Sequence, residues 1–269
     1  MAWAQITALW LGTWRDRWHS LVGWALGMVA LVAVMMAVYP SIRSTSGNLE
    51  AYIAAMPEAF RAMFRLSDYS SGAGYLSAEL FSFMLPMVFI GLGIAWGSGA
   101  TALEEERGTA DLLLTLPVSR ERVLLSKLGA LLTAVLGLGV LLWLSLMVGG
   151  WAIDLTVGAG ELLAVCLTTV LLGWLFAAVG LLAGALTGRR GIAAGVAIGL
   201  ALAGFLLYSL GPLSDSLTTA MKLTPFQWAY GNDPIRTGLD AGYLALLLGL
   251  TVVLCAASVV AFRRRDVGT

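Results

Sequence analysis

Long runs of apolar residues dominate the chain, and polar residues are confined to short segments between them. A helix needs about 20 apolar residues to cross the hydrocarbon core of a bilayer. Runs of about that length occur at six places, and we predict one span at each: 21–39, 80–103, 123–150, 162–186, 192–210 and 243–262. The pattern predicts an all-α membrane protein in which residues 1–269 form a single domain with six transmembrane helices.

Composition narrows the function classes. Hydrophobic residues make up 59% of the chain and charged residues 12%, about half the share of charge in soluble domains. No GxxxxGK[ST] phosphate loop occurs, so we do not expect the chain to hydrolyse ATP by itself. The sole histidine, His19, has no acidic cluster with metal-ligand spacing around it. We therefore predict no catalytic, cofactor or metal site, and a net charge of zero without a basic patch argues against nucleic acid.

The distribution of Lys and Arg predicts the orientation. Eleven of the 16 lie on the side that holds both termini and the segments after spans two and four, and five lie on the other side. Positive side chains collect on the cytosolic side of membrane proteins. We expect a multi-pass protein of the cell membrane with both termini in the cytosol.

The first 19 residues carry tryptophans at helical spacing: Trp3, Trp10, Trp14 and Trp18. This pattern predicts an amphipathic helix over residues 1–19 at the cytosolic interface, because indole rings favour headgroup depth and Arg15 interrupts the apolar run. In the alternative, Trp3 and Trp10 simply extend the first span.

The segment 211–242, between spans five and six, holds Pro212, Pro225, Pro234 and the aromatic cluster PFQWAY. Prolines at this spacing end one helix and begin another. We predict an outer loop built of short helices.

Small residues recur at four-residue spacing on spans four and five, where they allow helix backbones to approach closely. The favoured interpretation is a tight internal hairpin, and a dimer contact or a substrate path stays open. The predicted packing residues are Gly180, Gly184, Gly188, Gly191, Gly195 and Gly199.

Within the predicted spans, Lys127 is the one charged side chain, about a turn from the cytosolic end of span three. A secondary transporter usually places ionisable groups near the middle of the membrane. Since no such group is predicted, energy for transport has to come from a partner.

The segment 104–122, between spans two and three, holds eight charged residues in 19 positions. Acids at the carboxyl end of a helix oppose its dipole, so we infer that Glu104, Glu105 and Glu106 serve another purpose. Gly108 permits a turn, Thr109 caps a short leucine-rich helix that Pro117 ends, and Arg120 leads into span three. An exposed leucine-rich helix favours a docking partner over a merely solvated loop.

The stretch EEERGTADLLLTLPVSRERVLLSKL resembles the loop between the second and third spans of ABC-2 type permeases, the membrane subunits of ABC transporters. In that family, the short cytosolic helix between spans two and three is a coupling helix that seats in a cleft of the ATP-binding subunit. The resemblance implies that the ATPase contact consists of Glu104, Glu105, Glu106, Arg107, Gly108, Thr109, Asp111, Leu112, Leu113, Leu116, Pro117 and Arg120.

The resemblance also implies partners: a second permease, either an identical copy or a related chain, and two copies of a separate ABC ATPase that binds ATP and Mg. We expect the chain to be a transport subunit rather than an enzyme, and to export an amphipathic or lipid-like substrate by alternating access. The alternatives are an ABC-type subunit that does mechanical or assembly work on an extracytoplasmic partner, and an ATP-independent secondary transporter or scaffold.

Overall fold

The computed structural model describes residues 2–44, 52–57, 60–61, 66, 68–69, 71–100 and 120–264. No strand occurs among them, and the longer elements are helices. In chain order these are α1 (Ala2–Ser44), α4 (Gly72–Leu76), η1 (Ser77–Met84), α5 (Leu85–Gly97), α8 (Arg120–Ala152), α9 (Ala159–Thr187), α10 (Arg190–Leu210), η2 (Gly211–Leu213), α11 (Asp215–Met221), α12 (Pro225–Tyr230), α13 (Pro234–Thr237) and α14 (Ala241–Arg264).

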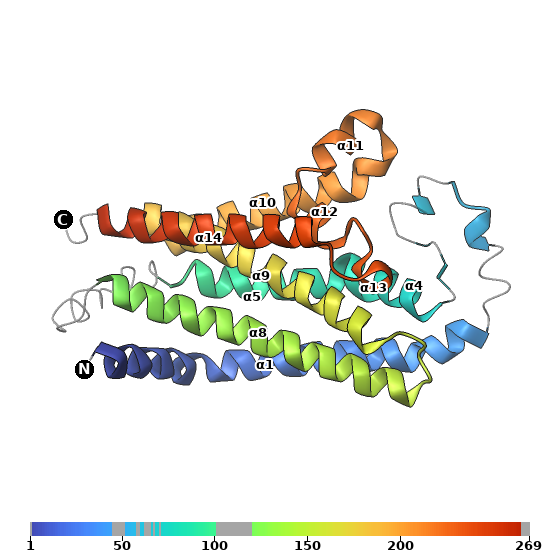
Figure 1. Cartoon of the computed structure of the whole chain (residues 1–269), viewed down its shortest axis with the longest axis horizontal. Coiled ribbons are helices and arrows are strands. Elements are labelled where there is room, and N and C mark those ends of the chain that lie inside the picture. Colours follow the sequence, from blue (N-terminus) through green and yellow to red (C-terminus); the bar gives the residue numbers. More distant parts are fainter. Residues whose placement is uncertain are drawn as a thin grey trace.

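Six helical stretches within this described part are long and apolar enough to cross a membrane. They are Trp10–Ser44, Gly72–Gly97, Arg122–Ala152, Ala159–Thr187, Arg190–Leu213 and Ala241–Arg264. The all-α fold with six spans is therefore confirmed. The long helices run along one common direction, and α1 begins at the same end of the molecule at which α14 ends (Figure 1). We call this end the terminal end and the opposite one the far end.

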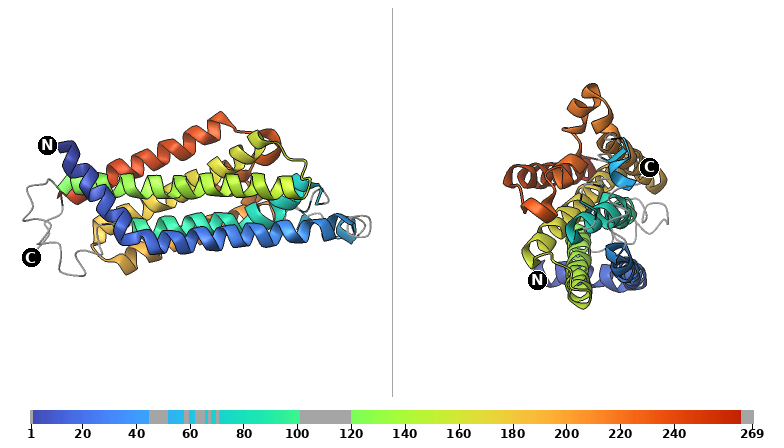
Figure 2. Two further views of the ribbon diagram at one scale, coloured as in Figure 1. Left: turned by 90° about the horizontal axis from the view of Figure 1, so that it is seen from below. Right: turned by 90° about the vertical axis from the view of Figure 1, so that its right-hand side faces the viewer.

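The helix α9 is the centre of the bundle. It contacts α5, α8, α10 and α14, and the two further views in Figure 2 place it between these neighbours. Most of its side chains are buried, among them Leu172 and Phe176. A helix that is apolar on all sides is expected at such a central position.

Glycines bring α5 and α9 into close contact. A Cβ on Gly93 or Gly97 would overlap the backbone oxygen of Gly173 or Ala177, and a Cβ on Gly173 would lie 3.1 Å from the Phe89 oxygen. Small residues four apart provide this approach in a bilayer, where dispersion contacts replace the hydrophobic effect as the driving force. The α5–α9 pair is thus packed backbone to backbone.

The second span differs from the prediction at its start. The sequence predicts a span from residue 80, but the helical stretch begins at Gly72 and includes the π-helical segment η1. Glu79 therefore lies inside a candidate span, and the prediction that Lys127 is the one charged residue within the spans is wrong. The residues before Leu80 are too polar to be recognised as part of a span from the sequence. They form helix because Ser71 caps the first turn, where its Oγ accepts a hydrogen bond from Gly74 N at 3.0 Å.

The helix α1 is continuous from Ala2 to Ser44. Figure 2 shows that its first part is bent relative to the rest. The tryptophan-bearing segment 1–19 is thus joined to the first span without a helix break, and its interfacial position stays a prediction.

Short helices form the connection between α10 and α14, where prolines predict them. Thr224 caps α12, with Oγ1 accepting from Gln227 N at 3.2 Å, and Pro225 follows at the first helical position. Buried Tyr230 shares a hydrogen bond of 2.9 Å with Thr169 of α9, so this connection is fastened to the bundle core.

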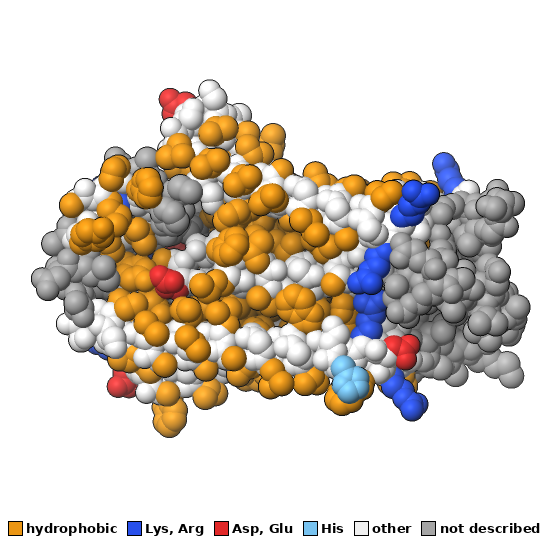
Figure 3. Space-filling model, turned by 180° about the vertical axis from the view of Figure 1, so that it is seen from behind, with side chains coloured by type: hydrophobic (Ala, Val, Ile, Leu, Met, Phe, Trp, Pro, Cys, Tyr) orange, Lys and Arg blue, Asp and Glu red, His pale blue; other side chains and the backbone are white. Residues whose placement is uncertain are grey.

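Large apolar side chains cover the outside of the bundle. Figure 3 shows them along the length of one face, with Lys and Arg gathered in a band near the terminal end. Exposed examples are Leu26, Val148 and Val252. Such a surface is stable against lipid tails and unstable in water.

Candidate functional site

The predicted ATPase contact lies almost entirely in the segment that connects α5 to α8. Residues 101–119, which include Glu104 to Pro117, lie outside the described residues. Arg120 begins α8. The described structure shows the two helix ends between which this segment runs.

A lysine holds the carboxyl end of α5. Lys127 Nζ of α8 donates a hydrogen bond of 2.9 Å to the carbonyl oxygen of Ala100, just beyond the end of α5. Carbonyls at a helix carboxyl end carry partial negative charge, and a hydrogen bond from a charged donor is worth about 2 kcal/mol. Lys127 thus binds α5 to α8 rather than only extending toward the interface.

Two arginines approach the same helix end from other helices. The Arg17 guanidinium of α1 lies 5.0 Å from the centre of the Trp96 ring, a cation–π contact. A Cβ on Gly99 would lie 3.2 Å from Arg17 Nη2 and 3.6 Å from Arg190 Nε of α10. We call Arg17, Lys127 and Arg190 the terminal cations.

The terminal cations come from α1, α8 and α10, and all three surround residues 96–100. The positive charge complements the negative end of α5. The connecting segment therefore leaves the bundle from a helix end that α8 and α1 hold by a hydrogen bond and a cation–π contact, with Arg190 of α10 close by.

The predicted packing glycines fall into two groups. Gly180 of α9 packs on α5, where its Cβ would lie 3.1 Å from Ser98 N. Gly188 ends α9 in the left-handed region with φ 64°, and its N–H donates 2.9 Å to the oxygen of buried Gly184. These contacts differ from the predicted packing against span five.

The glycines on α10 face away from the rest of the helix bundle. A Cβ on Gly191, Gly195 or Gly199 would meet no atom within 4 Å. The α10 face that packs on the bundle carries alanines instead, with Ala193 and Ala197 fully buried. The two helices are neighbours, as the hairpin interpretation predicts, but on α10 the buried small residues are Ala193 and Ala197 rather than the predicted glycines.

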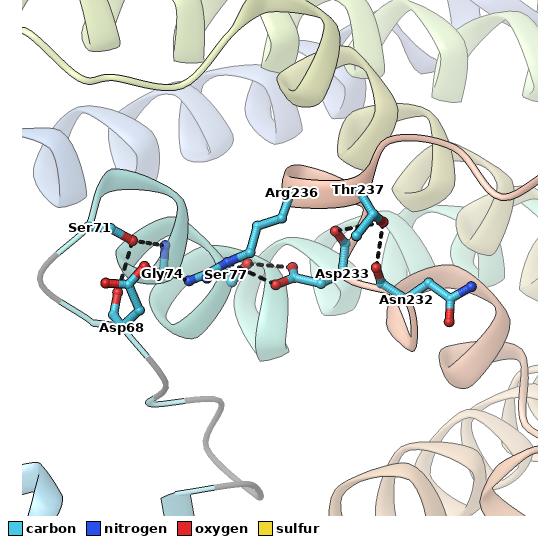
Figure 4. A network of polar contacts seen from close by, with 8 residues as sticks. All are labelled: Asp68, Ser71, Gly74, Ser77, Asn232, Asp233, Arg236 and Thr237. Carbon is cyan, nitrogen blue, oxygen red and sulfur yellow. Dashed lines mark hydrogen bonds and ion pairs between the residues drawn. The ribbon is translucent and has the colours of Figure 1, made fainter.

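A polar network fastens the far end (Figure 4). Arg236 of α13 pairs through Nη2 with Asp68 at 3.2 Å and through Nε with Asp233 at 3.1 Å. Ser77 of η1 donates to Asp233 Oδ1 at 3.1 Å. The network joins the segment before α4, the start of η1 and the loop before α13.

Both carboxylates of this network lie on strained backbone. Asp68 has φ 57° and Asp233 has φ 52°, a region that costs a residue with a side chain about 1 kcal/mol or more. Gly74 is required nearby, because a Cβ there would overlap the Asp68 carbonyl oxygen. Strain that ion pairs hold in place is often found at functional sites.

Three tyrosines form a chain of ring contacts that begins at Tyr69, next to Asp68 of the network and to the carboxylate of Glu79. The Tyr69 hydroxyl donates to Glu79 Oε1. The Tyr75 ring lies 5.7 Å from the Tyr69 ring and 5.1 Å from the Tyr39 ring. Burial, and then the hydrogen bond to Glu79, raise the pKa of Tyr69 well above its ordinary range, so Tyr69 remains a neutral donor.

The family model for ABC-2 family transporter proteins matches residues 11–267, nearly the whole chain. The chain belongs to the ABC-2 transporter family. It is a multi-pass permease subunit, and permeases of this family work with an ABC ATPase subunit. No curated protein matches the chain.

In this ABC-2 permease, sequence reasoning missed Glu79, Arg17 and Arg236. Glu79 lies just before the predicted start of span two at Leu80. The signal for an earlier start is Ser71, a residue type that favours the N-cap of a helix. The partners of Arg17 and Arg236 lie on helices distant in sequence, and spacing along the chain carries no signal for them.

Proposed function

We propose that this permease is the membrane half of an ATP-driven exporter, in which the segment 104–122 contacts a separate ATPase. The observation that supports this most is the anchored carboxyl end of α5. Lys127 donates a hydrogen bond to the carbonyl oxygen of Ala100, and the side chains of Arg17 and Arg190 lie close to Gly99. A force on the connecting segment would reach three other helices directly.

Tight packing would carry that force across the membrane. The α5 backbone lies against α9 through Gly93 and Gly97, and α9 contacts α10 and α14. Close-packed interiors move as rigid bodies rather than deform gradually. Movement of the α5 end would therefore shift the bundle as a unit.

The working complex would contain two ATPase copies, which bind ATP and Mg, and two permeases. The open glycine face of α10 supports the second permease, because a surface of small residues lets another helix approach closely. The band of Lys and Arg near the terminal end supports a cytosolic position for that end (Figure 3).

In this mechanism, ATP binding draws the two ATPases together, and the coupling helices follow. The permeases then rock so that a central path opens to the outside, and hydrolysis resets them. The mainly apolar helix faces favour an amphipathic or lipid-like cargo over a sugar or an inorganic ion.

The test is a mild-detergent pull-down of tagged full-length protein from its native membrane, with identification of bound subunits and an ATPase assay. We expect a soluble subunit with a phosphate-loop motif to copurify. The triple variant Glu104→Lys, Glu105→Lys and Glu106→Lys should lose it, while Asp16→Lys, an exposed reversal on α1, should retain it.

Copurification that survives the triple reversal would contradict the proposed contact. A folded permease that comes down alone would instead favour an ATP-independent transporter or scaffold. An extracytoplasmic partner in the eluate, together with an absence of ATP-dependent flux, would favour mechanical or assembly work.

A further inference from the structure

Glu79 is an unusual residue for its position. It lies within the candidate span Gly72–Gly97 and on the π-helical segment η1. A π-helical turn is a rare interruption of an α-helix and is frequently found at functional sites. A carboxylate inside a span is costly and marks a functional site by default.

The negative charge of Glu79 is only partly offset by its surroundings. Its hydrogen-bond donor is the neutral hydroxyl of Tyr69. Arg236 pairs with Asp68 and Asp233, and no ion pair to Glu79 is found within the part of the chain that the structure describes. A half-buried carboxylate in this setting favours an incoming positive charge.

The Tyr69 ring beside Glu79 favours an organic cation. The faces of aromatic rings carry negative charge and attract ammonium groups. Tyr69 is half-buried and so accessible to a ligand, whereas Tyr75 and Tyr39 are buried and only support it from the inside. A metal ion would need several oxygen ligands, and among the described residues no group of three His, Cys, Asp or Glu side chains could hold one.

An aromatic surface begins one helical turn from Glu79. Phe83 is 51% exposed, and its ring lies 5.3 Å from the ring of Phe205 on α10. Phe205 in turn packs on buried Phe226 of α12, with the two rings 5.7 Å apart. The same side of the second span thus offers a carboxylate and, one turn away, the apolar pair Phe83 and Phe205, which suits a hydrocarbon chain.

We infer that Glu79 and Tyr69 recognise the ammonium group of an amphipathic organic cation, and that Phe83 and Phe205 contact its apolar body. This inference rests on the proposed function, for which it names the substrate class. The Glu79 carboxylate attracts the positive charge, and the Tyr69 hydroxyl orients that carboxylate. The two phenylalanines favour cations with an apolar body over small cations.

The test measures binding to purified full-length permease in nanodiscs, with empty nanodiscs as the blank. The probes are the dodecyltrimethylammonium ion and dodecyldimethylamine N-oxide, which has the same chain and no net charge at pH 8. We expect the wild type to prefer the ammonium ion about tenfold, and Glu79→Gln to remove that preference.

Matched variants separate charge from packing. Glu161→Gln alters another half-buried carboxylate at the far end, which lies in the first turn of α9 and complements the dipole of that helix; it should leave both affinities unchanged. Phe83→Ala should weaken both probes equally, because it removes apolar contact only. Tyr69→Phe keeps the carboxylate charge but removes the hydroxyl that orients it, so the ammonium preference should fall without disappearing.

Equal binding of the two probes to the wild type would overturn the inference, as would a preference that persists in Glu79→Gln. If Glu79→Gln does not fold, Glu79→Asp serves instead, with a reduced preference expected and an unchanged preference overturning the inference. The assay contains no ATPase, so failure of the ATPase pull-down would refute the proposed function without affecting this result.

Discussion

The two ends of the second span carry opposite charge and are stabilised in different ways. At the far end, Glu79 sits on a π-helical segment beside neutral tyrosines. At the terminal end, Lys127 and two arginines surround the helix carboxyl end. The terminal charges satisfy a helix dipole and so have a structural role. The far-end carboxylate lies away from any helix end and accepts a hydrogen bond from Tyr69, and we propose that it also binds a cationic ligand.

The α5–α9 contact connects these two ends, and breaking it should have the largest effect. In Gly97→Leu, the side chain would collide with the Ala177 carbonyl, and overpacking against backbone costs about 3 kcal/mol or more. We expect loss of a monodisperse protein or a large fall in the melting temperature in detergent. Gly137→Leu on α8, where a Cβ meets no atom within 4 Å, should melt like the wild type.

Removing the lysine at the terminal end should have the next largest effect. Lys127→Gln loses a charged hydrogen bond to Ala100, worth about 2 kcal/mol. We expect a lower melting temperature and a loss of ATPase-driven transport greater than the loss of ATPase binding. Arg122→Gln, an exposed change on the same helix, should leave transport intact, and equal loss in both variants would mean a general charge effect.

Breaking the far-end network should have a moderate effect. Arg236→Gln removes partly exposed ion pairs to Asp68 and Asp233, each worth about 0.2–1 kcal/mol in water. We expect the free energy of unfolding, measured by thermal denaturation, to fall by about 1 kcal/mol. High salt should make the difference between the variant and the wild type smaller. The exposed change Lys222→Gln is the control, and a salt-independent loss would contradict the ion-pair account.

The smallest effect should appear at alkaline pH. Because the pKa of Tyr69 is raised in the folded protein, the neutral form of Tyr69 contributes to the stability of the fold. This contribution is fully present below about pH 10 and is lost as the pH rises further. We expect Tyr69→Phe to remove one tyrosine that ionises well above pH 10 in an ultraviolet titration. If the number of tyrosines that ionise late is the same in this variant and in the wild type, the pKa of Tyr69 is not raised.

The sequence predicts the spans well because apolar run length is a direct physical requirement of the bilayer. It misplaces the start of the second span, since the turns before Leu80 contain Ser, Gly and Glu79 yet still form helix. Tertiary packing overrides the local polarity there. A pattern along the chain does not report which neighbour stabilises a polar turn.

The candidate sites show the same limit. Four-residue spacing on α10 correctly indicates a small face, but Gly191, Gly195 and Gly199 lie opposite the buried Ala193 and Ala197. When a helix has two faces of small residues, the sequence alone does not show which of them packs on the bundle. The terminal cations come from three helices far apart in the chain, and only their arrangement in space shows that they meet.

The most direct test is ATP hydrolysis by the copurified complex in nanodiscs, with and without the dodecyltrimethylammonium ion. We expect this cation to stimulate hydrolysis in the wild type. Glu79→Gln should lose the stimulation together with cation binding, whereas Lys127→Gln should bind the cation normally and still lose the stimulation. Stimulation that is unchanged in both variants would contradict the proposal that cation binding at Glu79 is coupled through Lys127 to the ATPase contact.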